Sequence, residues 1–132
     1  MEPCCSFRSP GTATWLHVAV PGHVHGSLGQ IRDPVTELLV SAASAWEIGT
    51  KFRLGKLDEA QAVVHGYAGH LQRLGAAELP VTSHHALTAG LLNWHHRDPF
   101  DRMIATQCML ESIPLVTRDW AIAAFPGLRV IW

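Results

Sequence analysis

The chain has little that would direct it to a membrane or cross-link it covalently. It contains no uncharged apolar run long enough for a transmembrane helix, and its amino terminus lacks the basic start and apolar block of a signal peptide. Its three cysteines, Cys4, Cys5 and Cys108, do not suggest a disulfide framework. We therefore expect a soluble cytoplasmic protein that acts away from membranes.

A strong excess of either charge is also absent. Lys and Arg number 10 and Asp and Glu number 11, which gives a formal net charge of -1. A nearly neutral chain lacks the overall basic footprint of a protein that binds nucleic acid tightly and nonspecifically. A local basic group is present at Lys51, Arg53 and Lys56.

What the chain does have is enough apolar sequence for one compact domain. It is 132 residues long and 48% hydrophobic, which allows a buried core. From Glu37 onward, short apolar runs alternate with helical patterns, and this alternation is typical of an α/β fold with a parallel sheet between helices. We predict strands at 38–40, 78–82, 113–117 and 128–131, and helices at 42–54, 58–74, 83–92, 99–111 and 120–125.

Residues 1–30 are atypical beside the orderly remainder, 31–132, although we assign all of 1–132 to a single domain. This first part is rich in Pro, Gly, Ser and His. Its one apolar run, 16–20, is a candidate strand that ends at a Pro-Gly pair.

Glu47, Asp101 and Asp119 each stand at or near the start of a predicted helix. Two of those helices directly follow strand-like runs, and parallel strands bring such positions to one edge of the sheet. Carboxylates that gather within a few ångströms repel one another unless a cation neutralises them. Carboxylate oxygens suit Mg²⁺ or Mn²⁺, and a metal-activated water serves phosphodiester hydrolysis. We therefore consider all three acids as metal ligands and catalytic residues.

Each acid also has an ordinary explanation as a helix cap. Ser44 and Glu47 have the spacing of a capping box, and Asp98 followed by Pro99 has the pattern of a helix start. Asp119 is placed to cap a short helix. The residues alone leave capping and catalysis open.

Other polar and aromatic residues are weaker candidates. Thr117 either orients a ligand through its hydroxyl or is structural. Arg102 and Arg118 contact phosphate, pair with the acids, or form surface salt bridges. Trp46 and Trp94 are expected in the core or an interface rather than as platforms for stacking bases.

The adjacent histidine pairs, His84-His85 and His95-His96, do not favour zinc. Neighbouring residues do not share a helix face as an i,i+4 pair does, and no cysteine pair completes a structural zinc site.

Several motifs occur together in a specific order: LVSAASAWEI at 39–48, LGKL at 54–57, HRDPFDR at 96–102, PLVTRD at 114–119 and a terminal VIW. Each is weak alone, but together they resemble the PIN-domain ribonucleases, specifically the VapC toxins of bacterial toxin–antitoxin pairs. The resemblance implies a three-layer α/β/α sandwich with a central parallel sheet. It also implies Mg²⁺- or Mn²⁺-dependent cleavage of RNA, often tRNA or rRNA, inhibition by a VapB-type antitoxin, and a homodimer. Glu47, Asp101 and Asp119 match three acids of the family's active site by position.

One feature of that family is missing. VapC proteins begin with an apolar strand that ends in Asp followed by Thr or Ser, and this Asp is a principal metal ligand. Here the only acid before Asp33 is Glu2, which no apolar strand precedes. His17, His23 and His25 are poor replacements because imidazole suits Mg²⁺ badly.

Three functions are consistent with this departure. We expect a metal-dependent endoribonuclease toxin that is impaired by the loss of its first acid. The alternative is an inactive PIN-domain remnant that still binds an antitoxin, and a third is an unrelated α/β binding domain whose acids only cap helices.

A change of reading frame would account for the missing acid. Cys4-Cys5 is encoded by TGY-TGY, and reading one base earlier gives NTG-YTG, which encodes Leu, Met or Val and then Leu. The shifted frame restores the kind of apolar run that follows the family's first Asp. We hypothesise that residues before about Ile31 are translated out of the ancestral frame.

Overall fold

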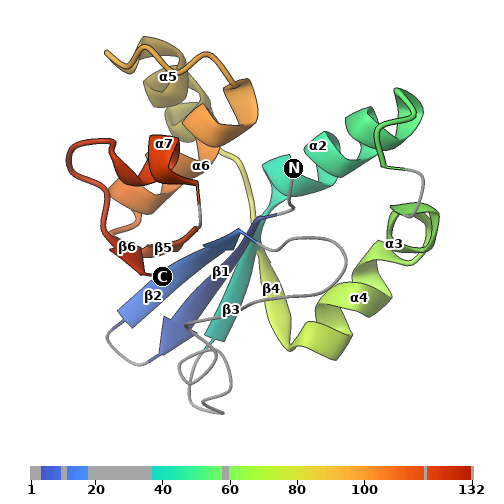
Figure 1. The fold of residues 1–132 in the computed structure, drawn as a ribbon. Helices are drawn as coiled ribbons and strands as arrows, with labels where there is room; N and C mark the ends of the chain where they lie inside the picture. Colours follow the sequence, from blue (N-terminus) through green and yellow to red (C-terminus); the bar gives the residue numbers. More distant parts are fainter. Residues whose placement is uncertain (1–3, 10–11, 18–36, 58–59, 118, 132) are drawn as a thin grey trace.

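The computed structural model describes residues 4–9, 12–17, 37–57, 60–117 and 119–131, and Figure 1 shows their arrangement. The strands are β1 (Cys4–Ser9), β2 (Thr12–His17), β3 (Glu37–Ser41), β4 (Ala76–Leu79), β5 (Leu115–Val116) and β6 (Val130–Ile131). The helices are α2 (Ala42–Arg53), α3 (Gln61–His65), α4 (Tyr67–Leu74), α5 (Ser83–Leu91), α6 (Pro99–Leu110) and α7 (Trp120–Ala123). Within this part of the chain, no helix is long and apolar enough to cross a membrane.

The strands form one sheet in the order β4-β3-β1-β2-β5-β6. Pairing is parallel between β3 and β4, between β2 and β5, and between β5 and β6. Among the described strands, β1 alone is antiparallel to its two neighbours, β2 and β3. Helices α2 to α4 lie on one side of the sheet and α5 to α7 on the other (Figure 1), so the predicted α/β/α arrangement is confirmed.

The amino-terminal part contains two strands where the sequence suggested one. The candidate strand at 16–20 is wrong in its bounds, since β2 ends at His17 and residues 18–20 lie outside the described residues. Strand β1 was not predicted at all. The signal that could have found it is the Pro10-Gly11 dipeptide between two short segments, because Pro-Gly is a strong turn former.

The predicted helix at 58–74 is wrong in its continuity. The chain forms α3 and α4, which are separated by Gly66 with φ -121° and ψ 29°. Glycine has a low helix propensity, so it is a natural place for the interruption. Gly75 ends α4 as predicted, in the left-handed conformation at φ +63°.

The strand predicted at 78–82 is β4, which begins earlier and is shorter. It ends before Pro80 because proline has no N–H to give to a sheet. The last three predicted elements are also present but shorter, as β5, α7 and β6. Helices α2, α5 and α6 end within about one residue of their predicted bounds, the disagreement expected at helix ends.

The core lies between the sheet and α6. Ile104 and Cys108 stand four residues apart on one face of α6, both at most 2% exposed, and pack with strand residues such as Leu39 and Leu115. Trp94 packs partly buried against this cluster, which confirms its expected place in the core. Because α6 is held so firmly, the acid in its first turn is held firmly too.

Candidate active site

The start of α2 decides how Glu47 is presented. Ser41 is the N-cap: its Oγ accepts a hydrogen bond from the N–H of Ala43 at 3.1 Å and donates one to Gln107 Oε1 at 2.6 Å. The predicted capping box of Ser44 and Glu47 is therefore wrong, because both residues lie inside the helix. The helix start needs nothing from Glu47, so its carboxylate is free for another role.

The Glu47 side chain is only 3% exposed and accepts from the Lys51 ammonium at 2.5 Å, one turn further along α2. Burial raises the pKa of Glu47 above its usual value, and the Lys51 interaction opposes that rise. The charges of Asp101 and Asp98 raise the pKa of Glu47 further. A buried carboxylate with other acids nearby is a typical environment for a functional group.

The start of α6 places a second acid beside the first. Asp98 is the N-cap as predicted, and its Oδ1 accepts from the N–H groups of Phe100 and Asp101 at 2.9 and 3.1 Å. Asp101 in the first turn is 6% exposed, and its Oδ2 lies 2.6 Å from His96 Nε2. Burial raises the pKa of Asp101, the His96 contact lowers it, and Asp98 and Asp119 raise it.

Asp119 is the N-cap of α7, so the capping interpretation is confirmed for this acid. Its Oδ1 accepts from the N–H of Ala121 at 2.8 Å. Its own N–H donates to Thr117 Oγ1 at 3.0 Å. Thr117 is 2% exposed. By accepting this hydrogen bond, its hydroxyl fixes the backbone between the end of β5 and Asp119. One carboxylate oxygen used in capping leaves the other available.

Arg102 neither pairs with an acid nor is placed to bind phosphate. Its guanidinium donates hydrogen bonds of 2.8 to 3.1 Å to the carbonyls of Ala89, Leu92, Trp94 and His96. A guanidinium has about five N–H groups, so four bonds leave too few for a two-pronged phosphate contact. The expectation for Arg102 is corrected to a structural role, and Arg118 lies outside the described residues.

Among the residues that the structure describes, His85 and His96 have side-chain partners inside the protein. His85 is 3% exposed: it forms a capping box with Thr82 at the start of α5, and its Nε2 lies 2.9 Å from Glu111 Oε1. His96 contacts Asp101, and its ring stacks on Trp94 with centroids 4.6 Å apart. Both histidines therefore contact residues at the two ends of α6, Glu111 and Asp101.

Glu47 and Asp101 have the oxygen ligands that a hard divalent cation prefers. Glu47 and Asp101 offer buried carboxylate oxygens, and the negative charge of Asp101 raises the pKa of Glu47, a repulsion that a bound cation would relieve. Across the residues that the structure describes, no group of three His, Cys, Asp or Glu side chains is gathered to hold a metal ion. The sharing of one ion by Glu47, Asp101 and Asp119 stays a prediction.

The sheet places the end of β2 beside the end of β5, which leads to Asp119. Leu16 pairs with Val116 on the parallel strand β5, and the next residue, His17, ends β2. The resemblance places an acid at the end of a central strand, and this chain has a histidine at the end of β2.

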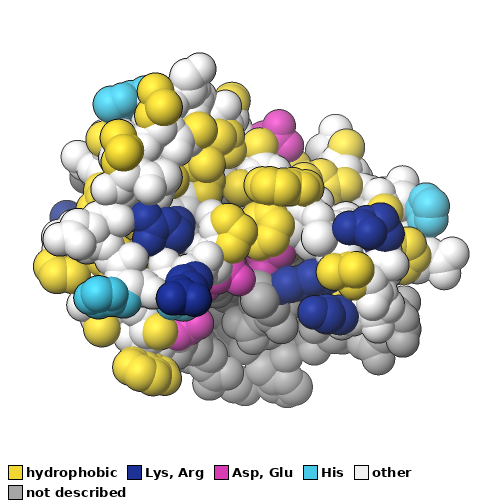
Figure 2. Space-filling view, turned by 90° about the horizontal axis from the view of Figure 1, so that it is seen from above, with side chains coloured by type: hydrophobic (Ala, Val, Ile, Leu, Met, Phe, Trp, Pro, Cys, Tyr) yellow, Lys and Arg dark blue, Asp and Glu magenta, His cyan; other side chains and the backbone are white. Residues whose placement is uncertain are grey.

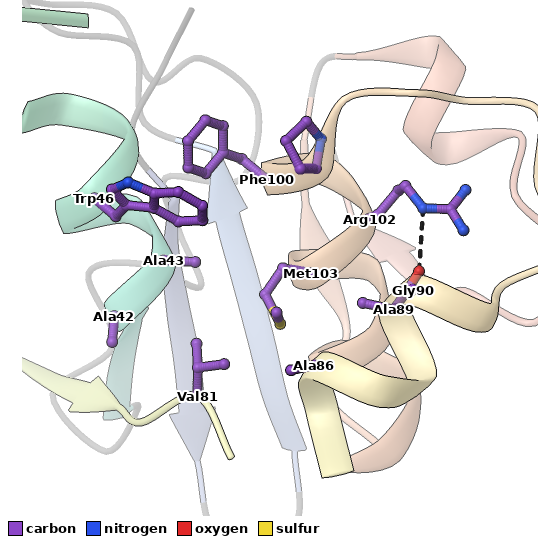
Figure 3. Close-up of a pocket in the computed structure, with 11 residues that line it drawn as sticks. Ala42, Ala43, Trp46, Val81, Ala86, Ala89, Gly90, Phe100, Arg102 and Met103 are labelled. Atoms are coloured by element: carbon purple, nitrogen blue, oxygen red, sulfur yellow. Dashed lines mark hydrogen bonds between the residues drawn. The ribbon is translucent and has the colours of Figure 1, made fainter. Parts of the chain in front are cut away.

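An apolar pocket opens beside the two acids. It has a volume of about 420 Å³ and lies between α2, α5 and α6 (Figure 3). Trp46 and Phe100, the chain neighbours of Glu47 and Asp101, meet edge to face at its rim with centroids 4.8 Å apart. Trp46 is 62% exposed, so it is not a core residue. Figure 2 shows acidic side chains at the centre of this face, with hydrophobic side chains beside them and Lys and Arg on both sides.

The comparison with known families agrees with this architecture. The PIN domain model matches residues 15–128 and thus includes residues 15–30, which the frame hypothesis assigns to another reading frame. That hypothesis stays a prediction. No curated protein matches the chain. Since the family model covers most of the 132 residues, the chain belongs to the PIN-domain family.

Proposed function

We propose that this chain is a metal-dependent endoribonuclease, the toxin of a VapC-type toxin–antitoxin pair, that acts in the cytoplasm on tRNA or rRNA. PIN domains are generally nucleases, and that broader activity follows from the family. The finer assignment is supported by the order of the motifs around Glu47, Asp101 and Asp119.

The observation that carries the proposal is the buried pair of carboxylates, Glu47 and Asp101. Ionised groups are costly to bury, and neither is needed to cap its helix, since Ser41 and Asp98 do that. Glu47 and Asp101, with Asp119, would hold Mg²⁺ or Mn²⁺. When bound, such an ion activates water and stabilises charge on a phosphodiester.

The test is cleavage of total tRNA and rRNA by the purified chain with Mg²⁺ or Mn²⁺. We expect cleavage to be lost in Glu47→Gln and in Asp101→Asn, which keep size and remove the charge. Glu78→Gln is the matched control, because Glu78 is exposed on β4. Cleavage that survives both site substitutions would come from a contaminant or another site, and the assignment would then be abandoned.

The pocket supports an antitoxin partner. Its lining is almost wholly apolar, with small residues such as Ala86, Ala89 and Gly90 on one wall, which suits the apolar face of a helix. We propose that a VapB-type antitoxin inserts apolar side chains there and so covers the acids next to it.

Co-expression with any small protein that is encoded beside this gene tests the partner. Ala86→Glu puts a charge into the pocket from an exposed position on α5, and Ala62→Glu makes the same change on the exposed surface of α3. Co-purification should be lost in the first variant and retained in the second. Equal retention in both would place the partner elsewhere.

A homodimer is proposed from the apolar surface of α5. Leu87 and Leu91 stand four residues apart and are 67% and 83% exposed, which is costly for a monomer. We expect a dimer in sedimentation equilibrium, and Leu87→Glu with Leu91→Glu should give a monomer. A monomeric wild type would remove this part of the proposal.

A specific observation also favours the second candidate, an inactive remnant that keeps antitoxin binding. No group of three candidate ligands is gathered among the described residues, and β2 ends in His17 instead of an acid. Absence of cleavage, together with retained binding of the antitoxin, would select this candidate.

A further inference from the structure

Lys51 is buried to a degree that sets it apart from its neighbours. Its side chain is 13% exposed, whereas Arg53 and Lys56 of the same basic group are exposed. Lysine is almost never buried unless it is paired, because its ammonium is strongly hydrated. Its partner is Glu47, one helical turn earlier on the same face of α2. The pairing with Glu47 thus accounts for the low exposure of the Lys51 side chain.

Among the described residues, the other charges that act on Glu47 are negative, and His96 lies against one of them, Asp101. Asp101 and Asp98 both act on the Glu47 carboxylate, and Lys51 is the cation that opposes them there. Its ammonium lies 2.5 Å from Glu47 Oε1. In the structure, Lys51 therefore occupies the electrostatic position that a bound metal ion would otherwise fill at this carboxylate.

We propose that Lys51 is an internal counterion that a divalent cation has to displace from Glu47, so that the lysine sets a low affinity for the metal. The inference rests on the proposed function, because it takes Glu47 as a ligand. The ammonium holds Oε1 of Glu47, and it repels a second positive charge that binds either oxygen of the same carboxylate. The Glu47 carboxylate stays paired with a cation without metal, and metal binding has to release the lysine.

The test is Mn²⁺ binding by the full chain, measured by electron paramagnetic resonance of free Mn²⁺ at constant ionic strength. We compare wild type with Lys51→Met, which keeps the length of the side chain and removes its charge. Lys56→Met is the matched control, since it removes the same charge from an exposed position in the same basic group. Lys51→Arg keeps a cation at the site.

We expect Lys51→Met to bind Mn²⁺ at least about tenfold more tightly than wild type, because a charge in contact acts much more strongly than a screened one. Lys56→Met and Lys51→Arg should stay within about threefold of wild type on the same argument. Tighter binding by Lys51→Met supports the inference even when wild type binds too weakly to measure.

Two results would overturn it. If wild type binds Mn²⁺ and Lys51→Met binds equally or more weakly, the counterion role fails while the metal site stands. If neither protein binds Mn²⁺, the metal dependence of the proposed function fails as well. If Lys51→Met is unfolded without metal, the inference requires that Mn²⁺ restore its circular dichroism spectrum and that NaCl at the same ionic strength not do so. Failure of Mn²⁺ to restore the spectrum counts against the inference.

Discussion

Replacement of Arg102 should destabilise the whole fold, although the residue lies next to a candidate active-site acid. Its guanidinium donates to the carbonyls of Ala89, Leu92, Trp94 and His96, and so fastens the last turn of α5 and the segment after it to α6. A hydrogen bond from a charged donor contributes about 1.5–3 kcal/mol to stability. Four such bonds would add to roughly 6–12 kcal/mol if they were independent, but bonds to one group are not additive.

We therefore expect Arg102→Met to lower the free energy of unfolding by about 3–5 kcal/mol, because four part-buried hydrogen bonds are lost whose contributions do not simply add. Against a total of about 5–15 kcal/mol for a domain, this loss is large. Arg102→Lys keeps the charge, but its ammonium lacks the planar fork that reaches several carbonyls at once. It should lose about 2–4 kcal/mol on the same scale.

Equilibrium unfolding in urea, followed by circular dichroism, measures these losses. With a slope of about 1–3 kcal/mol per molar urea, the midpoint of Arg102→Met should fall by roughly 2 M. Arg73→Met on α4 is the control, since Arg73 is exposed and should change stability by less than about 0.5 kcal/mol. If Arg102→Lys unfolds within about 0.5 kcal/mol of wild type, the carbonyl contacts do not hold the fold together and the reasoning is refuted.

Three further predictions concern packing and charge. Ser41→Ala removes an N-cap and the hydroxyl bound to Gln107, and should cost about 2 kcal/mol in urea unfolding; an unchanged midpoint would contradict this. Ile104→Ala, at a fully buried position, should cost about 2–5 kcal/mol by thermal unfolding, whereas Leu91→Ala, 83% exposed, should change little, and equal effects would argue against the core as described. The raised pKa of Glu47 means that the folded state binds this proton more tightly than the unfolded state does. Without metal, the contribution of Glu47 to stability is therefore full below about pH 4.5. It is lost as the pH rises through the pKa of the folded state. Urea unfolding at several pH values should thus show a smaller loss with rising pH in Glu47→Gln than in wild type, and identical slopes would be evidence against the burial of an ionisable Glu47.

Local signals were enough for much of the chain from residue 37 onward. Helix α6 could be read from Asp98 and Pro99 at its start, because capping depends on residues a few positions apart. The same holds for the end of α4 at Gly75. Asp119 as a cap was also foreseeable, since its partner, the N–H of Ala121, is only two residues away.

Residues whose roles depend on distant partners were not predictable in this way. The capping box at Ser44 and Glu47 has the right spacing but was wrong, since Ser41 already starts the helix and binds Gln107, which is 66 residues away. Arg102 was expected to contact phosphate or acids because nothing local shows the four carbonyls around it.

The sequence by itself determined where most helices and strands form, which acids lie at their starts, and the resemblance to the PIN-domain family. Periodicity and capping depend on residues that are a few positions apart, so they can be recognised from a short stretch of sequence. Only the tertiary structure decided that Glu47 is buried against Lys51 with Asp101 beside it, that Arg102 is structural, and that β1 and β2 fill the centre of the sheet. Burial and charge interactions arise from groups that meet in space, and distance along the chain does not fix which groups those are.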